Sequence, residues 1–197
     1  MSELEIVEVG KRYGPVVEAR IRYWQRMTRS SKGETEQANL KQVNDFINDA
    51  RFVDDKKIWK TEDYWATPLE FLIMDAGDCE DFSVAKYFTL EKMGVAMEKM
   101  RLTYVKSQTL NSAHMVLTYY PEPSSIPLVL DNLNPSILPA TERLDLTPVY
   151  SFNGNDLWLA KTRGHQEKVG SANTLKSWSA LKQRMKAGIP SIVVPIP

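Results

Sequence analysis

The sequence predicts an α+β fold, with helices first and an antiparallel sheet after them. Two observations carry this prediction. Helical patterns run through the first half of the chain, up to about residue 93, and β-branched or aromatic runs separated by polar and Pro-rich connections follow. The chain has 197 residues, of which 43% are hydrophobic and 25% charged, so we expect one domain over residues 1–197 with a sizeable core.

Three helices are expected before the single cysteine. The first covers residues 16–27 and the second residues 35–50, where apolar residues recur at helical spacing. The third begins at Thr67-Pro68, because proline suits the first helical position. A basic set in and after the first helix is expected to form a solvated face, with partner docking as the alternative: Arg20, Arg22, Arg26, Arg29 and Lys32.

Cys79 is expected in the first turn of a fourth helix. Asp78 is a good N-cap and Gly94 a good C-terminal stop, which together bracket Cys79–Met93. The helix is apolar nearly all round and should be central. Free backbone N–H groups and the helix dipole at its start favour a thiolate. The alternative is that this lone cysteine is a small buried apolar residue.

Three strands are expected next, as an antiparallel meander over Arg101–Lys106, Ala113–Tyr120 and Leu128–Leu133. A turn at residues 121–124 would put His114 directly opposite Asp131, where side chains share one face of the sheet. Cysteine, histidine and aspartate in this arrangement are a nucleophile, its base and an orienting carboxylate. The alternatives are that His114 is a satisfied core residue and that Asp131 begins a turn.

The remaining chain predicts strands at Val149–Phe152 and Asp156–Ala160 and a helix at Trp178–Met185. His165 falls in a polar turn and is expected to be exposed. Lys and Arg total 25, as do Asp and Glu, so no overall charge favours nucleic acid. No window approaches 18 apolar residues, so no membrane insertion is predicted.

Two segments carry a resemblance to a known family. They are Trp65-Ala66-Thr67-Pro68-Leu69-Glu70-Phe71-Leu72 and Gly77-Asp78-Cys79-Glu80-Asp81-Phe82-Ser83-Val84-Ala85-Lys86-Tyr87. The His114-Met115-Val116-Leu117 and Val129-Leu130-Asp131-Asn132-Leu133 segments continue the match in the same order. Over about residues 10–180 the chain resembles the bacterial transglutaminase-like cysteine proteinases of the LapG type.

The resemblance implies a papain-like, transglutaminase-like core and a triad of Cys79, His114 and Asp131. It also implies a periplasmic protease that cuts a large surface adhesin near its N-terminus, next to paired alanines, which releases the adhesin and disperses biofilm. An inner-membrane, LapD-like receptor for cyclic diguanylate is implied as the inhibitor that sequesters the protease. The implied cofactor is Ca²⁺, with the acidic residues beside the cysteine, here Asp78 and Glu80, as ligands.

A calcium site also has a physical motive. Asp78, Glu80 and Asp81 adjoin Cys79, and their negative charge raises a thiol pKa. Asp78 as an N-cap and acids in the first turn explain part of the cluster. Three carboxylates in four residues exceed what capping needs, and such oxygen ligands suit Ca²⁺.

Other expectations concern substrate and export. Trp65 is expected to line the substrate groove, with a core position as the alternative, and the Cys79 N–H is the expected oxyanion donor. The first residues, Met1–Glu5, are acidic and lack the apolar stretch of a signal peptide. Either the sequence is that of the mature protein or this member differs, and the periplasmic expectation rests on resemblance alone. The alternative functions are an acyltransferase that uses the same triad and an inactive binding module.

Overall fold

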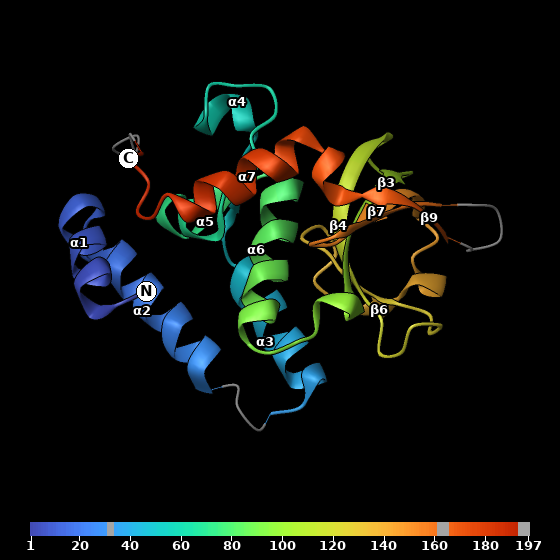
Figure 1. Cartoon of the computed structure of the whole chain (residues 1–197), viewed down its shortest axis with the longest axis horizontal. Helices are drawn as coiled ribbons and strands as arrows, with labels where there is room; N and C mark the ends of the chain where they lie inside the picture. Colours follow the sequence, from blue (N-terminus) through green and yellow to red (C-terminus); the bar gives the residue numbers. More distant parts are fainter. Residues whose placement is uncertain (31–33, 161–165, 193–197) are drawn as a thin grey trace.

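The computed structural model describes residues 1–30, 34–160 and 166–192. A group of helices lies beside a sheet, and helix α6 stands at the boundary between the two (Figure 1). The predicted α+β class is confirmed. The helices are α1 (Glu3–Tyr13), α2 (Pro15–Ser30), α3 (Glu36–Asn48), α4 (Asp55–Ile58), α5 (Pro68–Met74), α6 (Cys79–Lys92) and α7 (Lys176–Lys186).

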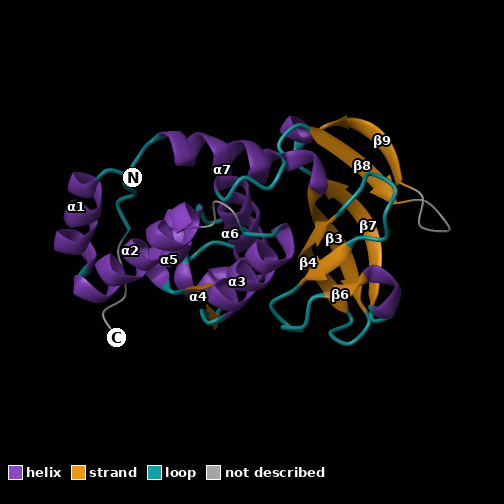
Figure 2. Ribbon diagram, turned by 90° about the horizontal axis from the view of Figure 1, so that it is seen from below, coloured by secondary structure: helices purple, strands orange, loops and turns teal. Residues whose placement is uncertain are grey.

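The strands form two sheets within the described residues (Figure 2). The small sheet pairs β1 (Arg51–Phe52) with β2 (Ala76–Gly77) in parallel. The large one is antiparallel and has the order β6-β5-β4-β3-β7-β8-β9. Its strands are β3 (Met100–Ser107), β4 (Ser112–Tyr119), β5 (Leu128–Leu130), β6 (Leu138–Pro139), β7 (Leu146–Phe152), β8 (Asp156–Ala160) and β9 (Gln166–Ser171).

Helices α1 and α2 form a hairpin around Gly14, whose φ of 94° suits glycine. Helix α1 is absent from the predicted elements, although its capping box of Ser2 and Glu5 can be read in the sequence. The hairpin buries Ile6 and Ile21 against α5 in a second, smaller core. The expected helices at residues 16–27 and 35–50 are present, as Pro15–Ser30 and Glu36–Asn48.

Helix α6 is central, as its all-round apolar pattern predicts. Val84, Tyr87 and Leu90 are each fully buried. The helix packs on α3 and α5 and against strand β4 of the large sheet. The Ser83 hydroxyl donates to the Met115 carbonyl oxygen at 3.0 Å, which sets the position of the helix along β4. The start of α6 is thereby held next to the strand that carries His114.

The expected register of β4 and β5 is wrong by two residues. Tyr119 lies opposite Leu128 and Leu117 opposite Leu130, because the connection between the strands is longer than a four-residue turn. Asp131 follows β5 and is not directly opposite His114. A shift of two residues keeps every side chain on its face of the sheet, whereas a shift of one would reverse it. The two residues therefore still share a face, as diagonal neighbours.

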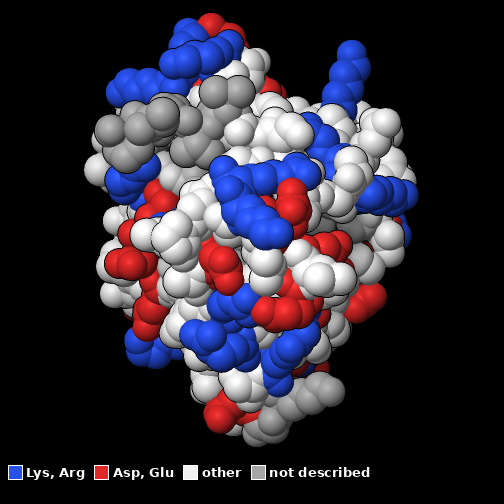
Figure 3. Space-filling model, turned by 90° about the vertical axis from the view of Figure 1, so that its left-hand side faces the viewer, with Lys and Arg blue, Asp and Glu red and all other residues white. Residues whose placement is uncertain are grey.

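Two of the basic residues of α2 are paired with acidic ones, and Lys32 of the expected basic set lies outside the described residues. Arg22 binds Glu18 at 2.9 Å and also contacts Glu3, while Arg20 binds Asp75 at 2.7 Å. Figure 3, which views the helical end of the molecule, shows Lys and Arg interspersed with Asp and Glu. These pairs favour a solvated helix face over a basic docking face.

The later elements agree with the expected strands and helix. Strand β8 has the expected bounds, β7 begins three residues earlier, and α7 covers the expected Trp178–Met185. His165 lies outside the described residues. Within the described ranges, no helix is long and apolar enough to cross a membrane.

Candidate active site

The chain places Cys79 at the first position of α6 by a sharp connection from β2. Asp81 anchors this connection, because its Oδ1 accepts the Ala66 N–H at 2.6 Å and its Oδ2 accepts the Asp78 N–H at 3.4 Å. Gly77 is required here, since a Cβ at this position would lie 2.6 Å from Asp81 side-chain atoms. The segment that contains Trp65 and the segment that contains Cys79 are thus joined through one buried carboxylate.

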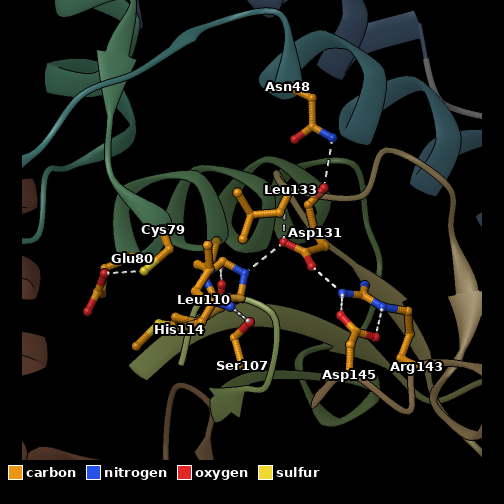
Figure 4. Close-up of polar contacts among 12 residues, drawn as sticks. Asn48, Cys79, Glu80, Ser107, Leu110, His114, Asp131, Leu133, Arg143 and Asp145 are labelled. Atoms are coloured by element: carbon orange, nitrogen blue, oxygen red, sulfur yellow. Dashed lines mark hydrogen bonds and ion pairs between the residues drawn. The ribbon is translucent and has the colours of Figure 1, made fainter. Parts of the chain in front are cut away.

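The structure brings His114 and Asp131 together. His114 Nε2 lies 2.8 Å from Asp131 Oδ1, and both side chains are buried. In Figure 4 the imidazole lies between Cys79 and Asp131. An ionised carboxylate only accepts, so Nε2 carries the proton in this bond. The other ring nitrogen, Nδ1, is then the one that can take a proton from a thiol.

The Cys79 thiol donates to Glu80 Oε2 at 2.7 Å (Figure 4). Burial raises the pKa of this thiol, and the negative charge and hydrogen bond of Glu80 raise it further. Asp78 acts in the same direction, whereas the Met115 backbone opposes it. In this arrangement the cysteine is held as a neutral thiol, so it needs compensation of the acidic charge to react as a thiolate.

Asp131 is surrounded by donors. Besides His114, the Leu133 N–H donates to its Oδ1 at 3.0 Å and Arg143 Nη2 donates to its Oδ2 at 2.7 Å. Burial alone would raise the pKa of Asp131, but the bonds from His114, Leu133 and Arg143 lower it to about 2. The Asn48 amide also donates to the Asp131 carbonyl oxygen at 2.8 Å. Arg143 and Asn48 are absent from the predicted site residues, because no local pattern links them to Asp131.

A cluster of three carboxylates lies beside Cys79. Asp55, Asp78 and Asp81 each offer one oxygen, and these oxygens lie within 4.8 Å of one another. Asp55 comes from α4, far from the cysteine in sequence, and is absent from the predicted ligands. Glu80, expected as a ligand with Asp78 and Asp81, is not one of these three, and its Oε2 accepts from the Cys79 thiol; its role as a ligand stays a prediction.

The cluster has the properties of a cation site. Burial raises the pKa of Asp55 to about 6, and burial together with the charges of Glu80 and Asp55 raises that of Asp78 to about 8. The Oδ1 atoms of Asp55 and Asp78 are buried without a hydrogen-bond partner among the described residues. Hard oxygen ligands with unmet negative charge are what Ca²⁺ binds. These three residues therefore fit a calcium ion.

Trp65 lies at the edge between core and site. It is 6% exposed and stacks on Phe152, with ring centroids 5.7 Å apart. It also lines a hollow of about 320 Å³ beside the acidic cluster, together with the stacked rings of Tyr104 and Tyr150. Its substrate role stays a prediction.

The comparisons with known proteins agree with this geometry. Residues 18–146 match the family described as bacterial transglutaminase-like cysteine proteinase BTLCP. The chain belongs to this family. No curated protein matches the sequence at a significant level.

Solved structures of Legionella pneumophila LapG resemble the whole fold. The EGTA-treated protein is 43% identical, with a TM-score of 0.83, and the match covers 94% of this chain and 98% of LapG. The calcium-bound protein is also 43% identical, with a TM-score of 0.80 over 94% of this chain and 99% of LapG. The family and these structures identify the protein as a transglutaminase-like cysteine protease.

Proposed function

We propose that the protein is a calcium-dependent cysteine endopeptidase whose catalytic residues are Cys79, His114 and Asp131. The observation that carries the proposal is the buried His114–Asp131 bond of 2.8 Å next to a cysteine at a helix start. This is the arrangement of a nucleophile, a base and an orienting group. The cysteine has no partner for an internal disulfide, because it is the only one in the chain.

The reaction follows from these positions. His114 Nδ1 takes the proton of the thiol, and the Cys79 sulfur attacks the carbonyl carbon of the scissile peptide bond. The Cys79 N–H, at the start of α6, stabilises the oxyanion. His114 then gives its proton to the leaving amine, and a thioester remains on Cys79. Water, deprotonated by His114, hydrolyses the thioester and restores the thiol.

Asp55, Asp78 and Asp81 would hold the calcium ion. When bound, Ca²⁺ supplies positive charge that offsets the carboxylates beside the thiol. The chain itself contributes the fixed positions of these oxygens, through Asp81 with Ala66 and through the bond from the Tyr64 N–H to Asp55 Oδ2 at 2.6 Å. The existence of calcium-bound and EGTA-treated structures of LapG supports calcium binding by this chain.

The proposed substrate is the N-terminal region of a large surface adhesin, cut next to paired alanines in the periplasm. Cleavage would release the adhesin and disperse biofilm, and an inner-membrane, LapD-like receptor for cyclic diguanylate would sequester the enzyme. The 43% identity to Legionella LapG over nearly the full chain supports this part of the proposal.

The test is incubation of the purified protein with N-terminal fragments of adhesins from the same genome, in calcium. Mass spectrometry would locate any cut. We expect one dominant cut next to paired alanines, lost in Cys79→Ala and in EGTA. Fragments that stay intact with the wild type, or that Cys79→Ala cuts equally well, would refute the proposal.

A further inference from the structure

A buried arginine lies directly behind the candidate catalytic pair. Arg143 is 5% exposed, and its Nη2 donates both to Asp131 Oδ2 at 2.7 Å and to Asp145 Oδ2 at 2.8 Å. Its Nε also donates to Asp145 Oδ1 at 2.9 Å, so Asp145 holds the guanidinium through two bonds. Figure 4 shows the resulting chain, in which Asp145 contacts Arg143, Arg143 contacts Asp131, and Asp131 contacts His114.

Stability alone does not account for this arrangement. Apolar residues of similar volume in place of a buried ion pair are often neutral or stabilising, so three charged side chains need another reason. The geometry supplies one. The Leu133 N–H donates to Oδ1 of Asp131 and Arg143 donates to Oδ2. Together these bonds fix the plane of the Asp131 carboxylate, with Oδ1 directed at His114 Nε2.

Asp145 balances the charge of the arginine. An arginine alone behind Asp131 would weaken the attraction of that carboxylate for a protonated His114. The carboxylate of Asp145, whose side chain is 36% exposed, forms an ion pair with Arg143 and offsets its positive charge. The pair therefore orients Asp131 with little net charge of its own.

We propose that Arg143, held by Asp145, is a positioning residue that fixes the orientation of Asp131 and through it the tautomer and direction of His114. This inference rests on the proposed triad. Among the described residues, Arg143 bonds to Asp131 and Asp145 and does not line the hollow that contains Trp65. It therefore acts on the site through Asp131.

Three variants separate orientation from charge. Arg143→Met removes both, Arg143→Lys keeps the charge but loses the planar fork, and Asp145→Asn keeps Arg143 but removes one of its anchors. Arg22→Met is the matched control, because Arg22 also bridges two carboxylates, Glu3 and Glu18, and lies on α2, away from the sheet (Figure 1).

The first readout is the rate of cleavage of an adhesin fragment in the presence of calcium, divided by the concentration of reactive thiols. A misplaced catalytic group costs on the order of 100-fold, so we expect Arg143→Met to lower kcat by about 10- to 100-fold while KM stays within about twofold. Arg143→Lys should recover part of the loss, Asp145→Asn should lose least, and Arg22→Met should match the wild type. Reactive thiols are counted with a peptide-based electrophile that requires the folded site, so unfolded protein is not counted and its presence leaves kcat per thiol unchanged.

The second readout does not need a substrate. The chain has two histidines, so ¹⁵N NMR of the imidazoles with His165→Gln as the assignment variant isolates His114. We expect one neutral tautomer with the proton on Nε2 in the wild type and a mixture of tautomers in Arg143→Met. The pH must be held constant, because Lys86 on α6 also faces Asp131, and burial lowers its pKa to about 7.

The outcomes distinguish the two proposals. A wild type that cuts no fragment counts against the proposed function, and the NMR comparison still decides on Arg143. Unchanged kcat per thiol and unchanged His114 signals in Arg143→Met would overturn the inference. Should Arg143→Met fail to fold, the same two measurements on Arg143→Lys and Asp145→Asn decide it.

Discussion

Two sets of acidic side chains lie near the candidate nucleophile, Asp131 and the cluster of Asp55, Asp78 and Asp81, and their pKa values are shifted in opposite directions. Asp131 is 1% exposed, and its donors lower its pKa to about 2. Asp81 is fully buried, and burial followed by the charge of Asp78 raises its pKa well above the usual value. Burial is common to both groups. The difference lies in compensation, because Asp131 faces the cationic Arg143 and accepts hydrogen bonds from His114 and the Leu133 N–H, whereas Asp81 faces other carboxylates.

This difference assigns the two groups different tasks. The Asp131 group is complete within the protein, and it can orient His114 without an ion. The Asp55, Asp78 and Asp81 group is incomplete, and it needs a cation before the thiol beside it can ionise. The two groups should therefore fail in different ways when they are altered.

Both groups act on Cys79, so its removal has the largest expected effect. Cys79→Ala should lower kcat by on the order of 10⁶-fold, as loss of a nucleophile does in other proteases. Folding should be unaffected, because no disulfide is lost and the change is small. Quantitative cleavage assays with circular dichroism as the folding control check this. Substantial activity in Cys79→Ala would show that Cys79 is not the nucleophile.

The second largest effect is expected from a change at Asp131, the carboxylate that is compensated within the protein. Asp131→Asn should lower kcat by on the order of 10⁴-fold, because the amide favours the wrong His114 tautomer. Added calcium should not recover the loss, since this group does not bind the ion. A titration of activity with Ca²⁺ from micromolar to millimolar concentrations tests both statements. Recovery at high calcium would mean that the two groups are not separate.

Breaking the incomplete group should give a loss that calcium does recover. Asp55→Asn or Asp78→Asn should raise the calcium concentration for half-maximal activity by on the order of tenfold, equivalent to about 1.4 kcal/mol. EGTA should inactivate the wild type, and Mg²⁺ should restore it less well than Ca²⁺. Calorimetry of Ca²⁺ binding to each variant provides an independent measurement. Undiminished activity in excess EGTA would show that the carboxylates need no cation.

The smallest expected effect is on stability without calcium. The folded pKa values of Asp55 and Asp78, about 6 and about 8, lie above the ordinary value of 3.8. At pH values between the ordinary and the raised pKa, the folded state therefore binds more protons than the unfolded state. Stability of the calcium-free protein should therefore fall as the pH rises from 5 to 7. Calcium or Asp55→Asn should reduce this dependence, as followed by urea unfolding.

The complete group should respond in a different pH range. The folded pKa of Asp131 is lowered to about 2, so its contribution is present above pH 3.8 and is lost as the pH falls from there toward 2. Unfolding curves below pH 4 for the wild type and Asp131→Asn would show this. Identical acid unfolding of the two proteins would contradict the pKa assignment.

The errors of the sequence prediction are physical in origin. The predicted β4–β5 register was two residues off, because the sequence of a Pro-rich connection does not show how many of its residues form the turn. The face shared by His114 and Asp131 was nevertheless right, since an even shift preserves alternation. Asp55 was missed as a member of the acidic cluster because it is distant from Cys79 in sequence, and Glu80, whose carboxylate contacts the thiol, stays a predicted ligand.

The sequence by itself determined the features that depend on near neighbours along the chain. These are the helix start at Cys79, the central position of its apolar helix, and the α+β order of elements. Capping, periodicity and alternation act over a few residues, so they can be read from the chain. Only the tertiary structure decided that Asp55 joins Asp78 and Asp81, and that Arg143 and Asn48 support Asp131. These contacts depend on distance through space and on burial, which arise when helices and sheet pack together.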